Sequence, residues 1–392
     1  MGAKRLVRRE SRSSSDVPRR RGMVHFACVC LTVSLAMLTI GRQAEAQKIL
    51  TTVPVALYGQ AIGVNPKTHK IYVVSEPGNE VTEIDQQTSV ETVISLGPTS
   101  EKSLDGAIRI DPVRNKIYAT NVVNSTLAVI DGTTHAVTFV PTGKYPTSLE
   151  INPRTHKIYV VNSGSDNITV IDGSSLKTNT IAVGSFPSDV AINWKTNAVY
   201  VTNAHSNNVS VIHGRKNKVQ TVEAGNYPAP VAVNQATNEA YVGNLAGDTV
   251  TVIHGWSKHT QTVKVSPYPF CIVANERTNK VYMNHQAAGS ITVIDGQTKK
   301  AATIGSGIIG ASGPNGLALD ELRNKIYVAE WTTRVTIIDG ATGSTSTAVN
   351  PGYNTHKIVA NPLANEFYTL NITTNTNNPY PPSSVTVFAG PK

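Results

Sequence analysis

The sequence predicts an all-β protein, a β-propeller built from four-stranded antiparallel blades. Three observations support this fold class. A unit of about 41 residues recurs along nearly the whole chain, each copy divides into four short strand-forming segments, and the start of the repeat region completes its last copy. We expect eight blades, with seven as the alternative, because all eight copies keep their central tyrosine motif.

The repeat is most easily followed through its tyrosine. Successive tyrosines are 41 residues apart in five of the seven intervals and 45 or 46 apart in the other two. Seven positions before each tyrosine stands Asn or Asp, which we call the anchor. The tyrosines are Tyr72, Tyr118, Tyr159, Tyr200, Tyr241, Tyr282, Tyr327 and Tyr368; the anchors are Asn65, Asp111, Asn152, Asn193, Asn234, Asn275, Asp320 and Asn361.

One copy, residues 147–184, shows why each unit is a blade. Its segments SLEIN, KIYVVN, NITVID and TNTIAVG are rich in Val, Ile, Thr and Tyr, and turn-forming residues separate them. Such short strands with turns between them form an antiparallel meander. No segment has a sustained helical period. A closed ring is favoured over an open solenoid because neither end resembles a polar capping repeat.

The two ends of the repeat region fit together. The eighth copy stops after its third strand, SSVTVFAG, and therefore lacks a fourth. Residues 51–65 align without a gap on residues 261–275, so that Val53 matches Val263 and Ile62 matches Ile272. The first strand of the mature chain is therefore predicted to complete the last blade, which removes both free sheet edges.

Residues 1–46 have the pattern of a secretory signal peptide. A basic, Ser-rich start precedes the mostly apolar run 24–40, and the small-x-small site Ala44–Ala46 follows. We expect cleavage after Ala46 and a single propeller domain over residues 47–392, located in the periplasm or outside the cell, including its surface. The alternative is an uncleaved anchor, since 17 residues barely span a bilayer. Met1 and Met23 both remain open as the start.

Removal of the predicted signal peptide changes the net charge and the number of cysteines, which indicate the kind of partner that the mature chain could bind. The signal peptide holds nine of the 35 basic and three of the 26 acidic residues, which leaves 26 and 23 and a net charge of about +3. The mature chain therefore carries no strong nucleic-acid signal. Cys28 and Cys30 leave with the signal, so Cys271 remains without a disulfide partner. No second hydrophobic span follows, and we expect a monomer.

The motifs around the repeat tyrosines resemble those of a known family. "YVTN" at 200–203, its variants "YATN", "YVVN" and "YVGN", and the "VIDG" that follows are similar to the repeats of YVTN-family β-propeller proteins. The resemblance covers almost the whole mature chain. It implies an exported or cell-surface propeller, often described as seven-bladed, and it implies no single activity. Related propellers include surface-layer proteins, lactonase-like enzymes and propeller subunits of quinoprotein dehydrogenases.

Four of the ten histidines occupy scaffold positions of the repeat. His213 and His254 stand where other copies have a turn-forming Asp, and His69 and His156 stand where others have Asn. We interpret these four as structural and His205 as a solvated loop residue.

The predicted binding surface is one mouth of the channel, where the loops between blades meet the turns between second and third strands. Seven residues before the anchors, four successive copies carry an aromatic residue followed by proline, which suits either a staple between blades or a ring of binding faces. These aromatic residues are Tyr145, Phe186, Tyr227 and Tyr268, and the first copy carries Tyr58 at the same position without the proline.

Departures from the repeat mark further candidates at this mouth, with sequence drift as the alternative. The last residue of the YVTN motif becomes His285 in copy six and Glu330, followed by Trp331, in copy seven. The first strands bring Asp189, Cys271 and His356. We expect His285, Glu330, Trp331 and His356 to lie side by side. Arg109 and Glu150 share a register on adjacent inner strands and predict a structural ion pair near the channel.

The commonest hydrolytic and redox motifs are absent from the sequence, which has no G-x-S-x-G, H-E-x-x-H or C-x-x-C. The catalytic residues stay unknown, and we predict no metal site and no cofactor. We expect a binding scaffold for an unidentified protein, peptide or glycan in preference to an enzyme. The alternatives are a lactonase-like hydrolase, with Glu330 and His285 at a divalent metal, and a propeller subunit of a quinoprotein-type redox complex.

Overall fold

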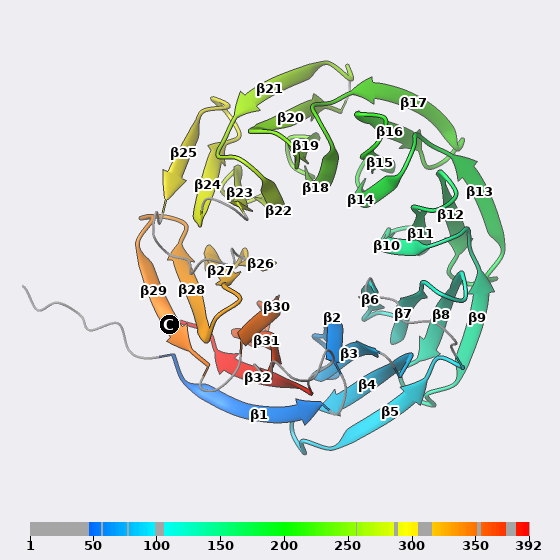
Figure 1. Ribbon diagram of the computed structural model, residues 1–392, viewed down its shortest axis with the longest axis vertical. Coiled ribbons are helices and arrows are strands. Elements are labelled where there is room, and N and C mark those ends of the chain that lie inside the picture. The colour runs from blue at the N-terminus through cyan, green and yellow to red at the C-terminus, as the bar shows by residue number, and fades with distance from the viewer. Residues whose placement is uncertain are drawn as a thin grey trace, which may run out of the picture. The chain divides into compact units, whose positions relative to one another are not determined.

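The computed structural model describes residues 47–55, 58–76, 78–98, 106–255, 257–285, 289–304, 316–350, 354–373 and 382–391. The predicted signal peptide, 1–46, lies outside this range. Eight four-stranded antiparallel sheets form a ring (Figure 1), and their first strands line a central channel. The predicted fold class is therefore confirmed, with eight blades. None of the described segments is a helix with the length and hydrophobicity that a bilayer crossing requires.

Each blade begins with an inner strand at the channel and ends with an outer strand at the rim. Blades 1 to 4 comprise β2 (Tyr58–Asn65), β3 (Lys70–Glu76), β4 (Glu80–Asp85) and β5 (Glu91–Ser95); β6 (Ile108–Asp111), β7 (Lys116–Asn121), β8 (Thr126–Asp131) and β9 (Val137–Pro141); β10 (Pro146–Ile151), β11 (Lys157–Asn162), β12 (Asn167–Asp172) and β13 (Thr178–Ala182); and β14 (Pro187–Asn193), β15 (Ala198–Asn203), β16 (Asn208–His213) and β17 (Lys218–Glu223).

The second half of the ring follows the same order. Blades 5 to 8 comprise β18 (Pro228–Asn234), β19 (Glu239–Asn244), β20 (Thr249–His254) and β21 (Thr260–Lys264); β22 (Pro269–Asn275), β23 (Lys280–His285), β24 (Ser290–Asp295) and β25 (Ala301–Ile304); β26 (Gly316–Asp320), β27 (Lys325–Ala329), β28 (Arg334–Asp339) and β29 (Thr345–Val349); and β30 (Asn354–Asn361), β31 (Glu366–Ile372), β32 (Ser383–Ala389) and β1 (Ile49–Val55).

The last blade closes the ring in the predicted way. Strand β1 pairs antiparallel with β32, with Val53 opposite Val385 and Val55 opposite Ser383. Both valines are buried, and they pack with Leu370 in the core. In Figure 1 the blue outermost strand β1 lies against the red β32, so the first and last described strands share one sheet.

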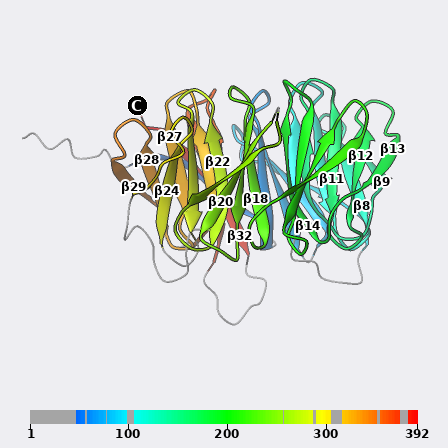
Figure 2. The ribbon, with the colours of Figure 1, turned by 90° about the horizontal axis from the view of Figure 1, so that it is seen from above.

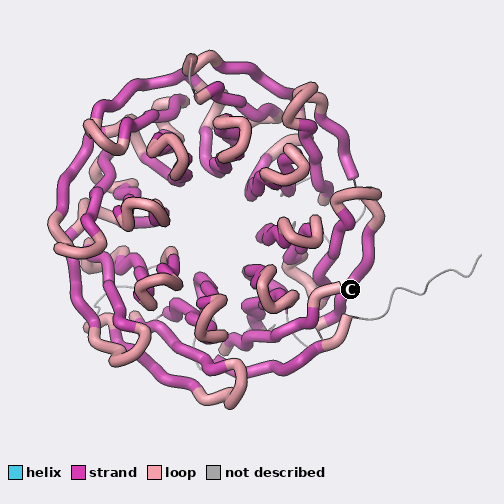
Figure 3. The backbone as a smooth tube through the Cα atoms, turned by 180° about the vertical axis from the view of Figure 1, so that it is seen from behind, coloured by secondary structure: helices cyan, strands magenta, loops and turns pink. Residues whose placement is uncertain are grey.

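The core lies between neighbouring blades. All eight repeat tyrosines are at most 1% exposed, and each packs among Val, Ile or Ala residues of its own blade and the next. Figure 3 shows how evenly the blades repeat around the channel. Burial of these aromatic rings supplies much of the hydrophobic stabilisation that holds blade to blade.

The loops gather on the two faces of the ring, as the view from above in Figure 2 shows. We name these faces by what they carry. The anchor face holds the turns between the first and second strands and between the third and fourth strands of each blade. The mouth face holds the loops between blades and the turns between second and third strands.

The anchors explain why Asn or Asp recurs at their position. The Asn193 side chain accepts hydrogen bonds from the backbone N–H groups of Lys195 and Thr196, both at 3.0 Å, which closes the turn after β14. Its Nδ2 donates to Oδ1 of Asn238 in blade 5 at 2.6 Å. Asn238 has a φ of 57°, in the left-handed region that Asn tolerates. One side chain therefore forms a turn and links two blades.

The same link explains one scaffold histidine. In blade 3 the residue that faces the preceding blade's anchor is His156, with Nδ1 3.0 Å from Oδ2 of Asp111. His156 takes the place that Asn holds elsewhere, as the repeat predicts, and its φ of 54° matches.

Candidate functional site

Bulges shape the inner strands at the mouth face. In five blades the pairing of inner and second strands shifts by one residue close to the mouth, as it does between Pro187 and Asp189. A β-bulge adds one residue on one strand and re-aims the side chains next to it. The residues just after these bulges, which we call the post-bulge ring, are Ala61, Ser148, Asp189, Cys271 and Lys357. Blade 5 adds a sixth shift, also of one residue, between Pro228 and Val231.

Asp189 is the acidic member of the post-bulge ring. Its Oδ1 accepts from the Ser148 hydroxyl at 2.9 Å and its Oδ2 accepts from the backbone N–H of Val231 at 3.1 Å. The carboxylate thus connects blades 3, 4 and 5. Desolvation inside the channel raises its pKa, against the opposing effect of these hydrogen bonds. Asp189, predicted as a binding residue, therefore lies in the channel wall with both oxygens engaged.

Arg109 and Glu150 lie one layer deeper and make the ion pair expected from their register. Arg109 Nε is 3.0 Å from Glu150 Oε2, and Arg109 Nη1 donates to the Ile108 carbonyl at 3.0 Å. The Glu150 carboxylate raises the pKa of Arg109. The pair joins blades 2 and 3, and both side chains border the open channel, where a cavity of about 670 Å³ has mostly apolar walls that include Ile151, Val233 and Val273.

The four predicted aromatic residues form an arc on the mouth face, at equivalent positions of blades 3 to 6. The exposed fractions are 56% for Tyr145, 37% for Phe186 and 51% for Tyr268, and Tyr227 is half-buried. We call these four residues the aromatic arc. All four have φ between 50° and 57°. Bulky residues are uncommon in this left-handed region, which costs about 1–2 kcal/mol for residues other than Gly.

The loop backbone around the arc is already paired. The carbonyls of Tyr145, Phe186 and Tyr227 accept from the N–H groups of Ser163, Ala204 and Leu245 at 2.9–3.0 Å. These bonds clamp each loop between blades onto the next turn, which fits the staple interpretation of the backbone. The rings themselves project beyond this clamp.

His205, predicted to be a solvated loop residue, is exposed and packs against the aromatic arc. Its ring stacks on Phe186 with centroids 4.2 Å apart and an interplanar angle of 12°, and it lies 5.8 Å from Tyr227. Sequence reasoning missed this contact, although the repeat register places His205 in the turn next to the loop of Phe186.

His285 and Glu330 do not project into the mouth. His285 is fully buried, with Nε2 2.7 Å from the Thr292 hydroxyl. Glu330 is 1% exposed and accepts a hydrogen bond from the Thr336 hydroxyl. In other blades the Asn at this position makes the equivalent bond, as Asn162 does to Thr169 at 2.9 Å. Both residues therefore substitute for the repeat Asn in holding the third strand.

Burial shifts the pKa of both side chains in the direction that keeps them neutral. It lowers the pKa of His285 to about 4 and raises the pKa of Glu330. The expected group of four is thus only partly formed. Trp331 and His356 meet edge to face with centroids 5.0 Å apart, and Tyr58 lies 6.0 Å from His356. His356 is 7% exposed, and burial lowers its pKa to about 3.

Over the part of the chain that the structure describes, no three His, Cys, Asp or Glu side chains converge in a way that could hold a metal ion. Cys271 lies in the post-bulge ring, where burial raises its thiol pKa. A buried, protonated thiol is a poor nucleophile.

Comparison with known proteins places part of the chain near one enzyme family. Residues 62–176 match the family model described as lactonase, 7-bladed β-propeller. The match covers blade 2 and most of blades 1 and 3. No curated protein matches the sequence. The solved structure of hydrazine synthase from Kuenenia stuttgartiensis is similar with a TM-score of 0.55 and 19% identity, over 71% of this chain and 94% of that one. At this identity the likeness is one of fold alone.

Proposed function

We propose that this protein is an exported β-propeller, related to the YVTN-repeat proteins, that binds a neutral oligosaccharide across its mouth face. The observation that carries the proposal is the aromatic arc. Four exposed or half-exposed rings stand at equivalent positions of four consecutive blades, each on a backbone conformation that disfavours a bulky residue. Strain of this kind at an exposed loop points from an outlier to a function.

The arc suits a sugar polymer for two reasons. Aromatic faces pack against the apolar faces of sugar rings, while tyrosine hydroxyls can bond to sugar hydroxyls. Side chains that repeat from blade to blade also match a ligand whose units repeat. An extended peptide would favour an open strand edge for main-chain bonding. Here the loop carbonyls of Tyr145, Phe186 and Tyr227 are already bonded to the neighbouring turns.

The test replaces two arc tyrosines with a residue that suits their backbone. Asn tolerates the left-handed region, so the Tyr145→Asn/Tyr268→Asn variant keeps the loop conformation and removes two ring faces. Calorimetric titration with cellohexaose, chitohexaose and maltohexaose would measure binding. We expect one of these sugars to bind and the variant to lose affinity about tenfold or more, with an unchanged or slightly higher melting temperature. Phe139→Asn is the matched control, because Phe139 is exposed on outer strand β9, away from the arc.

The staple interpretation predicts the opposite pattern. If the rings serve only to hold blades together, the double variant should melt well below the parent. Lack of binding by all three sugars would also contradict the proposal.

Lactone hydrolysis is the second candidate, favoured by the family match over residues 62–176. The catalytic groups would then be channel carboxylates such as Asp189 and Glu150, since His285 and Glu330 are buried and engaged within their own blades. The check is hydrolysis of aliphatic γ- and δ-lactones with and without added Ca²⁺. Activity that disappears in Asp189→Asn but persists in Glu330→Gln would place this function ahead of glycan binding.

A further inference from the structure

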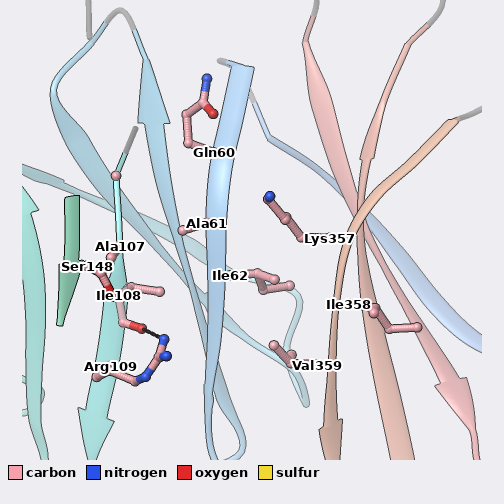
Figure 4. A pocket seen from close by; sticks show the side chains of 11 residues that line it. Gln60, Ala61, Ile62, Ala107, Ile108, Arg109, Ser148, Lys357, Ile358 and Val359 are labelled. Atoms are coloured by element: carbon pink, nitrogen blue, oxygen red, sulfur yellow. Dashed lines mark hydrogen bonds between the residues drawn. The ribbon is translucent and has the colours of Figure 1, made fainter. Parts of the chain in front are cut away.

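We infer that a recess in the channel wall at blade 1 binds the carboxylate group of a small organic acid. The recess has a volume of about 270 Å³. Its polar lining comes from Gln60, Arg109, Ser148 and Lys357, and its apolar walls include Ile62, Ile108 and Ile358 (Figure 4). This inference does not rest on the oligosaccharide proposal, because the aromatic arc belongs to blades 3 to 6.

The recess exists because blade 1 has a short side chain at the channel where the neighbouring blades have long ones. At the post-bulge position blade 1 carries Ala61, whereas blade 8 carries Lys357. Blade 2 contributes Arg109 from the next layer of the channel. A cationic side chain therefore stands on each side of a short apolar residue. In Figure 4 the Lys357 side chain extends from its strand toward Ala61 and Ile62, while Arg109 lines the opposite wall.

Lys357 is the side chain that we expect to bind the anion. Within the described residues its ammonium forms no ion pair and no hydrogen bond, although it is only partly exposed. Arg109 differs, because Glu150 already neutralises much of its charge. Because Lys357 pairs with no carboxylate of the described residues, its ammonium is available to an anion that enters the recess.

Gln60 gives the second, independent observation. It is the bulge residue of β2, between Gly59 and Ala61, and it is 8% exposed. Its side-chain amide makes no hydrogen bond to any other residue in the described ranges. The amide atoms are not enclosed by other side chains, so a ligand that enters the recess can reach them. The amide nitrogen could donate to one carboxylate oxygen and the Lys357 ammonium to the other.

The walls define the rest of the ligand. Ile62, Ile108 and Ile358 are each at most 7% exposed and offer only alkyl surface. A short acyl chain would bury apolar area there, at roughly 25 cal/mol per Å². The ligand class is therefore a monocarboxylate with a small aliphatic body. A highly charged anion such as phosphate would have no further cation to pair with besides Arg109.

The experiment is calorimetric titration of the mature protein at pH 7 with sodium hexanoate, butyrate and acetate. We expect saturable binding that strengthens with chain length, and much weaker binding of 1-hexanol and hexylammonium chloride. Lys357→Met should weaken hexanoate binding by about tenfold or more, since charge-assisted bonds are the stronger kind. Lys216→Met, at an exposed lysine of the β16–β17 turn, is the matched control and should leave binding unchanged.

A second variant keeps the inference testable if Lys357→Met does not fold. Ala61→Leu would fill the recess with alkyl groups and leave both cations in place, and it should also abolish hexanoate binding. Thermal melting and circular dichroism would confirm the fold of each variant. The inference is overturned if no acid of the series binds, if hexanol binds as tightly as hexanoate, or if Lys357→Met and Lys216→Met behave alike.

Discussion

The anchor face of this propeller keeps the same residues from blade to blade more closely than the mouth face does. On the anchor face, blade after blade uses the same bond, from an anchor to a left-handed Asn or His of the next blade, with distances from 2.6 to 3.0 Å. On the mouth face, equivalent positions carry Ala, Ser, Asp, Cys or Lys just after the bulges. The difference separates the part of the blade that maintains the ring from the part that is free to vary.

The two faces differ because an anchor residue makes several structural contacts and a post-bulge residue makes fewer. An anchor such as Asn193 closes a turn and links two blades, so few side chains can replace it. A post-bulge residue such as Lys357 projects from an inner strand that is already paired through its backbone. Its side chain can therefore change without disturbing the sheet.

The largest effect should come from removing the strand that closes the ring. Deletion of residues 47–55 exposes β32 and removes the buried Val53 and Val55, which alone contribute roughly 3–6 kcal/mol. We expect that the deletion variant no longer shows the cooperative melting transition of the parent protein. Adding a synthetic peptide of residues 47–55 should restore part of it, whereas unchanged melting of the deletion variant would refute closure by β1.

A smaller effect tests the anchor face directly. Asn193→Ala removes two turn bonds and the link to Asn238 at a fully buried position, which should lower the free energy of unfolding by about 2–3 kcal/mol. Asn226→Ala on the mouth face removes one exposed bond of 3.3 Å and should change it by less than about 0.5 kcal/mol. Chemical denaturation of both variants measures the contrast. Equal losses would show that the two faces do not differ in this way.

The smallest effect at neutral pH tests the histidine that replaces a repeat Asn. The folded-state pKa of His285 is about 4, below its ordinary value of 6.5, so the unfolded chain takes up the proton first. Its contribution is complete above pH 6.5 and is lost as the pH falls toward 4, by about 2–3 kcal/mol. His285→Asn should leave stability at pH 7 nearly unchanged and make the decline shallower. Parallel stability curves for both proteins between pH 7 and 4 would contradict this account.

The sequence repeat predicted much of the candidate site, whereas the remaining contacts could be seen only in the folded structure. The register of Arg109 and Glu150 predicted their pairing, because neighbouring inner strands run side by side. The alignment also found the arc tyrosines. It could not show that His285 and Glu330 turn inward to Thr292 and Thr336, because that depends on rotamers and not on spacing.

The sequence by itself determined the blade, the number of blades and the closure of the ring. These follow from strand-forming segments, turn residues and tyrosines that recur at a constant period, and each depends on neighbours close along the chain. The tertiary structure alone decided what faces the channel. Bulges of one residue re-aim the inner strands, and ring curvature brings Lys357, Gln60 and Arg109 of three blades around one recess. Residues separated by almost 300 positions meet there through geometry that no local pattern encodes.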